Sequence, residues 1–439
     1  MPSICLEDED IHDMNQSPSL PIAAWAEGCY IYDTNGKEYL DGSSGPIAVN
    51  IGHGVPEVLE AMSGQAKRIV FTYRTQFASQ AVLDLTAEIL GTAGKRYREV
   101  VYTNSGSEAT EAALRLVMHH HQAEGDTGRT AILSQIPSYH GMTAGALATS
   151  GHPGRREHLR ALHDHSASVV PVAAGGSEHL LPGIAEWEAA FASVGAHRIA
   201  AVVLEPVGGA AGGAAVVPDE VFRRIEELCR ASGALLVADE VMTGFGRTGA
   251  WFGHEHAGVT PDIVITGKGL SGGYTPIGAC LVGDRVLPGR SAADLAFGHT
   301  MSGNPLSAAT ALAVLRYTRE HRLAERAART GATLRDRLAT LAERFSFLGR
   351  PRGRGLLLAV PVLQHEEEFR RDPLARRICR TAQRLGLIVY PAGVSTRSQA
   401  VLVAPPLTIK ENEIDELLLR LARTLDTVRT EAEQGKVAV

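Results

Sequence analysis

ALLVADEV, residues 234–241, and PDIVITGKGLSGGY, residues 261–274, decide the fold of this 439-residue chain. In both stretches an apolar run of strand length leads into a charged residue, Asp239 in the first and Lys268 in the second. Earlier apolar runs alternate with amphipathic stretches, and these runs are REVVYT (98–103), RTAILSQ (129–135), SASVVPV (166–172) and RIAAVVLEP (198–206). Strands that alternate with helices imply crossover connections and a largely parallel sheet with both faces covered. The sequence therefore predicts an α/β large domain.

Lys268 stands out among the lysines. Only six of the 43 basic residues are lysine, and the other five, at positions 37, 67, 95, 410 and 436, lie in polar surroundings. Lys268 lies between an apolar strand and a glycine-rich turn, where a buried lysine needs a charged partner or a shifted pKa. It is either an ion-paired lysine at a strand end or a chemically active amine. With Asp239, it would supply the imine-forming lysine and the pyridinium partner of pyridoxal phosphate (PLP) chemistry.

Length and composition limit the class of protein. A chain of 439 residues exceeds what a single core usually supports, so we expect two domains or one large domain with an appendage. A formal net charge of -6 gives no basic surface for nucleic acid, and 44% hydrophobic residues are typical of a globular protein rather than a membrane span. Five scattered cysteines without a CxxC pair suit reduced thiols. We therefore expect a cytoplasmic protein with small-molecule partners.

The two ends of the chain are expected to form a second, smaller domain. Residues 1–20 are acidic, lack the features of a signal peptide and are predicted to be a mobile arm. Residues 21–60 contain a β-meander that has no core of its own, so we expect it to pack on the C-terminal part. Residues 61–324 form the predicted large domain. Residues 325–439 form the rest of an α+β domain that ends in an amphipathic helix from about residue 411.

A phosphate site is predicted where a strand leads into a helix at TNSGSEATEAALRL. Ser105, Gly106 and Ser107 precede or begin this helix, and backbone N–H groups at a helix start bind anions. Gly106 allows close approach of a phosphate, and Ser107 adds a hydroxyl. The alternative is an ordinary helix cap, with Ser107 as the capping residue and Glu111 in the first turns.

Further candidates follow other strands. Tyr139 of SYHGMT lies at the carboxyl end of a predicted strand, where ligands of open α/β sheets bind, and it could stack on a pyridine ring or simply pack at the sheet edge. His140 is expected at the cofactor as a hydrogen-bonding residue, because the free Lys268 amine is already a suitable proton shuttle. Asp239 and its neighbour Glu240 point to opposite faces, so only one carboxylate can meet the ring. Val241 shares the side of Asp239 and could press on that ring.

Three other motifs carry less weight. GFGRTG at 244–249 matches GxGxxG, but no helix or ribose-binding acid follows it as a dinucleotide site requires. HHH at 119–121 and HEH at 254–256 lack the spacing of a metal site and are expected to be solvated or structural. No metal is predicted.

The chain resembles the class III, or ω-type, PLP-dependent aminotransferases of PLP fold type I from about residue 20 onward. The matching stretches are YLDGSSG, NIGHGVPEV, SGSEATEAALRL, SYHGMT, LEPV, LLVADEVMTGFGRTG, DIVITGKGLSGGYTPIGA, HTMSGNPLSAA and APPLTI. The resemblance implies a mostly parallel seven-stranded sheet sandwiched by helices, with PLP as cofactor. It further implies that Lys268 is the Schiff-base lysine, Asp239 the pyridinium partner, and Val241 and Tyr139 the covers of the ring. Gly106 and Ser107 would hold the phosphate.

The resemblance also implies an obligate homodimer with active sites at the interface, because Thr300 of HTMSGNP would reach the phosphate of the neighbouring subunit. Glu205 of LEPV would lie beside the cofactor and pair with an arginine that binds the substrate carboxylate. Here the chain departs from the family, since Leu402 and Tyr390 stand at the two common places for that arginine. Arg74 and Arg397 are the remaining candidates.

The implied reaction is transfer of an amino group from an amino acid or amine to an oxo acid, aldehyde or ketone. It would follow a ping-pong aldimine/pyridoxamine mechanism, in which Lys268 moves the proton and Asp239 keeps the ring nitrogen protonated. A racemase, aminomutase or lyase on the same fold is the alternative.

Overall fold

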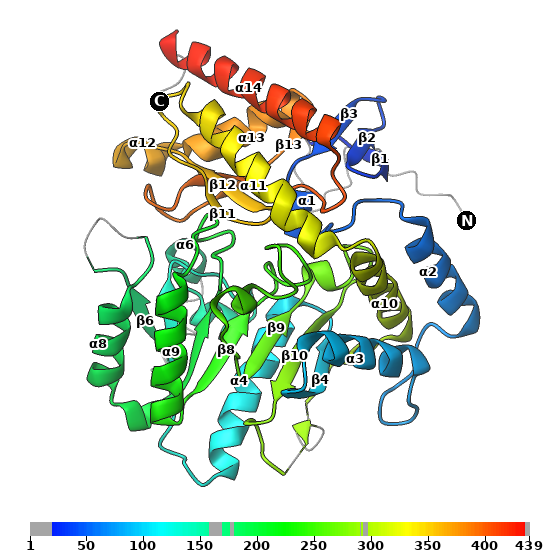
Figure 1. Ribbon diagram of the computed structural model, residues 1–439, viewed down its shortest axis with the longest axis vertical. Coiled ribbons are helices and arrows are strands. Elements are labelled where there is room, and N and C mark those ends of the chain that lie inside the picture. The colour runs from blue at the N-terminus through cyan, green and yellow to red at the C-terminus, as the bar shows by residue number, and fades with distance from the viewer. Residues whose placement is uncertain (1–19, 158–168, 176–179, 290, 293–296, 435–439) are drawn as a thin grey trace, which may run out of the picture.

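A seven-stranded sheet forms the centre of the structure (Figure 1). The computed structural model describes residues 20–157, 169–175, 180–289, 291–292 and 297–434, so the arm predicted for residues 1–20 lies almost wholly outside the described residues. The order of strands is β4-β10-β9-β8-β7-β5-β6, and β10 is antiparallel to both of its neighbours while the other pairs are parallel. The strands are β4 (Tyr97–Thr103), β5 (Ala131–Ile136), β6 (Val169–Ala173), β7 (Ile199–Leu204), β8 (Leu235–Asp239), β9 (Ile263–Thr266) and β10 (Gly278–Gly283). The predicted sheet is confirmed.

Helices cover both faces of this sheet because alternate side chains of each strand point to opposite sides. On β7, Val202 and Leu204 pack in one core with helices α8 and α9, whereas Ala201 and Val203 pack in another core with α4. A third core joins β9 and β10 to α3 and α10. The helices of the large domain are α3 (Gln80–Ala93), α4 (Gly106–Ala123), α5 (Ala144–Thr149), α6 (Pro153–Arg156), α8 (Ile184–Val194), α9 (Asp219–Ser232) and α10 (Pro305–Glu320).

Helix α9 shows how local sequence sets these elements. Phe222, Ile225 and Cys229 recur at helical spacing and are buried against the sheet. The helix ends at Gly233, whose φ of 80° is the left-handed conformation that glycine adopts without steric cost. Pro218 lies at the N-cap, one residue before the helix.

The smaller domain joins the two ends of the chain. The meander forms strands β1, β2 and β3, and β3 pairs in parallel with β13, with Leu40 opposite Leu387. Leu40 lies in the same core as Leu417 and Leu421 of α14, and Figure 1 shows the N-terminal strands beside that helix. A second sheet has the order β11-β12-β15-β14. These strands are β1 (Ala23–Glu27), β2 (Tyr30–Asp33), β3 (Glu38–Asp41), β11 (Arg352–Arg354), β12 (Leu357–Pro361), β13 (Leu387–Ile388), β14 (Tyr390–Ala392) and β15 (Ala400–Val403).

The remaining helices surround these sheets or connect them to the large domain. They are α1 (Ser44–Ile47), α2 (Pro56–Arg68), α11 (Leu323–Ala342), α12 (Glu366–Arg371), α13 (Leu374–Arg384) and α14 (Glu411–Glu433). The predicted apolar stripe of the last helix is buried at Ile414, Leu417, Leu421, Leu425 and Val428. Among the described residues, none of the helices combines the length and the apolar character needed to cross a membrane.

Candidate active site

A cavity of about 160 Å³ opens at the carboxyl ends of the parallel strands of the large sheet. This edge is where open α/β sheets bind ligands, because the loops that leave the strands converge there. The predicted residues that line the cavity are Gly106, Ser107, Tyr139, His140, Glu205, Asp239, Val241 and Lys268. They follow strands β4, β5, β7, β8 and β9, so residues more than 160 positions apart share one site.

Lys268 begins the short 3-10 turn after β9 and has a φ of 40°. Burial lowers the pKa of its amine to about 8, although the charges of Asp239 and Glu205 oppose that shift. The nearby charge of Arg155 lowers the pKa further. An amine with this pKa is neutral in a larger fraction of molecules near neutral pH, so it is a better nucleophile than an ordinary lysine.

Asp239 ends β8 and lies in the cavity, whereas Glu240 points away from it. Asp239 Oδ2 lies 2.7 Å from Nδ1 of the buried His140, and Oδ1 accepts a hydrogen bond of 3.0 Å from Val241 N. Burial lowers the pKa of His140, but the hydrogen bond and charge of Asp239 outweigh burial and leave the pKa raised. Glu240 accepts hydrogen bonds from the backbone N–H groups of Gly253 and His254 on the far side. Only Asp239 is therefore placed for chemistry in the cavity.

Glu205 follows β7 and is buried at the side of the cavity. Its carboxylate accepts hydrogen bonds from Tyr139 N at 3.1 Å and Gly209 N at 2.9 Å. Burial raises its pKa to about 7; the charge of Asp239 also raises it, while His140 and the two backbone donors lower it. Glu205 is thus a carboxyl group whose protonation state changes near neutral pH.

The start of helix α4 forms the opposite end of the cavity. Ser105 is the N-cap, and its hydroxyl accepts a hydrogen bond from Glu108 N, so the predicted alternative of Ser107 as the capping residue is wrong. Gly106 and Ser107 are left facing the cavity. A Cβ at Gly106 would lie 2.9 Å from both methyl carbons of Val241, closer than real Cβ contacts allow, so a side chain would close this end.

These features fit PLP. The start of α4 offers backbone N–H groups and Ser107 for a phosphate, Lys268 offers an amine for the aldehyde, and Asp239 offers an anion for the ring nitrogen. His140 Nε2 is buried and has no hydrogen-bond partner in the described part of the chain, which leaves one polar atom for a group outside the protein.

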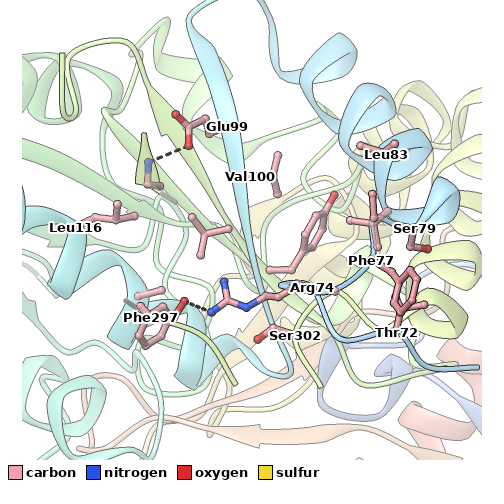
Figure 2. Close-up of a pocket in the computed structure, with 17 residues that line it drawn as sticks. Thr72, Arg74, Phe77, Ser79, Leu83, Glu99, Val100, Leu116, Phe297 and Ser302 are labelled. Carbon is pink, nitrogen blue, oxygen red and sulfur yellow. Dashed lines mark hydrogen bonds between the residues drawn. The ribbon is translucent and has the colours of Figure 1, made fainter. Parts of the chain in front are cut away.

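Four predicted residues do not line this cavity, and one of them is Ser105, which caps α4 instead. Arg74 lines a different cavity of about 290 Å³, where its Nη2 donates a hydrogen bond of 2.6 Å to Phe297 O (Figure 2). Arg397 is exposed in the loop before β15, and Thr300 is exposed between Phe297 and α10. Neither arginine lines the cavity that holds Lys268.

Sequence reasoning missed several residues of the site. Gly141 and Met242 also line the cavity. Gly141 has a φ of 133°, and its place in SYHGMT beside Tyr139 was a usable signal. Arg155 of α6 lies against Tyr139, with its Cζ 4.4 Å from the ring centroid, and nothing in the local sequence indicated this contact.

The histidine pairs and the glycine motif have structural roles. His121 Nε2 lies 2.9 Å from Ala200 O, and His254 Nδ1 lies 2.9 Å from Glu240 Oε1. The described residues contain no group of three or more side chains suited to hold a metal ion. GFGRTG forms turns that lead to a short 3-10 helix, not to the α-helix of a dinucleotide site.

Comparison with known proteins identifies the family of this chain. A family model for class III aminotransferases matches residues 12–425. The chain is 37% identical to the uncharacterized aminotransferase YodT of Bacillus subtilis, over 94% of this chain and 96% of that protein. It is 32% identical to a putrescine–pyruvate aminotransferase of Pseudomonas aeruginosa, over 92% and 90% of the two chains.

Solved structures of transaminases have the same fold. A PLP-bound amine transaminase from an uncultivated Pseudomonas species, in its internal aldimine form, matches with a TM-score of 0.86 and 31% identity over 96% of this chain and 99% of that one. The expected family, fold, cofactor and reaction class are therefore confirmed, and the chain belongs to the class III aminotransferases, which transfer amino groups with PLP.

Proposed function

We propose that Lys268 and Asp239 are the catalytic residues of this aminotransferase. The observation that carries the proposal is that both lie in one small cavity, where burial lowers the pKa of the Lys268 amine to about 8. When bound, PLP supplies an aldehyde that condenses with amines and a ring that withdraws electrons from the reacting carbon. Lys268 would hold the aldehyde and, once displaced, carry the proton to and from the substrate carbon. Asp239 would keep the ring nitrogen protonated.

The other lining residues would bind and orient the cofactor. Gly106 and Ser107 would bind the phosphate at the start of α4, with Ser105 shaping that helix start as its cap. Val241 and Tyr139 would cover the two faces of the ring. With Lys268 and Asp239, these placements would assign residues of this chain to the aldehyde, the phosphate, the ring nitrogen and both ring faces of PLP.

Two buried side chains would support this arrangement. His140 would position Asp239 through the 2.7 Å contact between its Nδ1 and the carboxylate. Glu205 would border both the cofactor and the substrate, because its carboxylate lines the cavity and fixes Tyr139 through the backbone N–H of that residue.

We propose two half-reactions at this one site. A donor amine enters and leaves as an oxo compound, and an oxo acceptor then enters and leaves as an amine. The name of the Pseudomonas aeruginosa relative, a putrescine–pyruvate aminotransferase, makes primary alkyl amines and small oxo acids the first candidates for this chain too.

We further propose a cytoplasmic homodimer with Thr300 directed to the phosphate of the neighbouring subunit. The support is the exposure of Thr300 and the resemblance of HTMSGNP to the family motif. The division into residues 21–60, 61–324 and 325–439 remains a prediction, and two of its boundaries fall inside helices α2 and α11.

The test is the visible absorption spectrum of the PLP-loaded enzyme with single donors and no acceptor. The donors are alanine, glutamate, β-alanine, 4-aminobutyrate, putrescine and isopropylamine. Loss of the yellow band, and its return when pyruvate is added, is the expected result. A band that stays yellow while a donor is racemised or eliminated would instead support the alternative reaction class, and Lys268→Ala should abolish every change.

A further inference from the structure

The cavity around Lys268 lacks a group for the negative charge of an amino acid substrate. Its lining holds two carboxylates, Glu205 and Asp239, the Lys268 amine and the His140 ring, whose Nδ1 already contacts Asp239, and none of the described lining residues is an arginine. An α-amino acid or oxo acid adds a further carboxylate to a site that already holds two. A cation close to the cavity is therefore required if such substrates are to bind well.

Three arginines outside the cavity lining, Arg247, Arg352 and Arg74, already donate hydrogen bonds to backbone carbonyl groups. Arg247 is fully buried and donates hydrogen bonds to Leu356 O at 3.1 Å and Pro405 O at 2.6 Å. Arg352 Nε donates to Gly213 O at 2.6 Å. Arg74, already placed in a different cavity, is bonded to a backbone carbonyl. These side chains donate to the protein's own carbonyl groups and do not line the cavity that holds Lys268.

Arg155 is differently placed. Its guanidinium Cζ lies 4.4 Å from the centroid of the Tyr139 ring, and Tyr139 lines the cavity. The side chain is half-buried at the rim, beside the ring of His152, which makes an edge contact with Tyr139 at a centroid distance of 6.2 Å. Among the described residues no carboxylate forms an ion pair with Arg155, and its guanidinium lies against Tyr139.

The charge of Arg155 reaches the reacting groups. After burial, it is the group that further lowers the pKa of His152, to about 4, so His152 is neutral and does not compete for an anion. It also lowers the pKa of Lys268. Among the described residues, Arg155 is the only arginine with this effect. A positive charge that acts on Lys268 would act equally on an anion bound beside it.

We propose that Arg155 binds the carboxylate of amino acid and oxo acid substrates. To do so the guanidinium leaves the Tyr139 ring, and it returns to that ring when the substrate is an amine without a carboxylate. The inference rests on the function proposed above and names the substrate class of that site. A two-pronged hydrogen bond between guanidinium and carboxylate is stronger than contact with a ring face, so the exchange is favourable. The flexible arginine stem on the short helix α6 allows the movement.

This arrangement suits a site that must accept two different substrates in turn. With a carboxylate present, Arg155 supplies the positive charge that pairs with that carboxylate. With an amine that has no carboxylate, the guanidinium remains on Tyr139 and is not left buried without a partner. Arg155 would therefore set which donors react, without taking part in the chemistry.

The test compares single half-reactions of the PLP-loaded wild type and Arg155→Met. Substrates are the fastest amino acid of the panel above and its analogue with a methyl group in place of the carboxylate, such as alanine and isopropylamine. For the amino acid we expect Arg155→Met to raise the apparent KM by about 10- to 100-fold, with a smaller change in the limiting rate. For the amine we expect both constants within about 2-fold of wild type. Arg155→Lys should restore part of the amino acid affinity, because it keeps the charge without the fork.

Arg156→Met is the matched control. Arg156 is the next residue on α6, and its guanidinium donates to Ser150 O instead of lying on Tyr139, so neither substrate should be affected. If Arg155→Met loses activity equally with both substrates, Arg155 only supports Tyr139 and the proposal is overturned. No loss of activity with either substrate would also overturn it. Amine turnover without any amino acid turnover in the wild type would also overturn it. No spectral change with any donor would refute the proposed transaminase roles instead.

Discussion

Gly106 determines how closely helix α4 approaches the cavity. Since a Cβ at this position would lie 2.9 Å from both Val241 methyl carbons, Gly106→Ala forces either the helix start or Val241 to move. Overpacking of this kind costs about 1–3 kcal/mol, so we expect at least about 5-fold weaker PLP binding. Absorbance titration of the apoprotein with PLP measures this affinity. Gly64→Ala, on α2 with open space around the added carbon, should bind PLP as wild type does.

A second variant separates crowding from other effects at Gly106. Val241→Ala removes both methyl carbons that the new Cβ would meet. If crowding is the cause, adding Val241→Ala to Gly106→Ala should recover thermal stability of the apoprotein relative to Gly106→Ala alone. If the loss of stability in the double variant equals the sum of the losses in the two single variants, the two changes do not interact. The conformational freedom of Gly106 would then matter more than its size.

The lowered pKa of Lys268 suits its proposed chemistry, but burial of its charge lowers the stability of the folded protein. Its pKa is lowered from the ordinary value of 10.5 to about 8 by burial, so between these values the folded apoprotein binds fewer protons than the unfolded chain, and its stability rises with pH in that window. Below pH 8 the full cost of the buried ammonium applies, up to about 3 kcal/mol. We expect the Lys268→Met apoprotein to melt a few degrees higher at pH 7, with the gain shrinking as the pH rises above 8. A gain that is constant from pH 7 to 10 would contradict this origin.

At the scale of elements, one arginine joins three segments of the chain. Arg247, in the turn after β8, donates to Leu356 O and Pro405 O from the C-terminal part and to Asn50 Oδ1 from the N-terminal part. Lysine keeps the charge but cannot reach several acceptors with a planar fork. We therefore expect Arg247→Lys to destabilise the protein by about 2–4 kcal/mol, seen as a lower melting temperature. Arg329→Lys, on an exposed face of α11, should change it little.

The elements also show what the sequence could predict. Six strands of the large sheet contain short apolar runs that the sequence shows, and the site could be placed because parallel strands present the residues that follow them at one edge. β10 has a weaker pattern, since GACLVG begins and ends with glycine. It is a strand because its two neighbours supply hydrogen bonds on both sides. That is a tertiary effect without a local signal.

The same limit applies within the site. Asp239, Lys268 and Gly106 have local signatures, namely a strand end, a glycine-rich turn and a helix start. Arg155 has none, because its contact with Tyr139 depends on how the loop after β5 folds back toward the cavity. Arg74 shows the opposite case, in which a plausible local motif lies at a separate cavity in the folded chain.

At the scale of the whole molecule, residues 69–83 expose several large apolar side chains close together in the sequence, a feature that can mark a protein interface. Ile69, Val70, Phe77 and Leu83 are 47%, 51%, 67% and 54% exposed. Phe77 also borders two cavities, of about 290 and 700 Å³. This surface lies next to the segment that carries Thr300, because Phe297, Ser302 and Gly303 line one of the same cavities. We expect the surface to be the homodimer contact.

Phe77→Glu tests that contact. A charge placed in a dry interface is costly, so we expect the variant to sediment largely as a 46.7 kDa monomer at micromolar concentration while the wild type sediments as a dimer. Its PLP affinity should fall in parallel, because the phosphate would lose Thr300 of the second copy. Leu419→Glu is the control, since Leu419 is 52% exposed on α14, far from this surface in the sequence, and the variant should remain dimeric and bind PLP normally. A wild-type protein that is monomeric and fully active would refute both the interface and the role of Thr300. A Phe77→Glu variant that is monomeric but binds PLP with wild-type affinity would support the interface and refute the role of Thr300 at the phosphate.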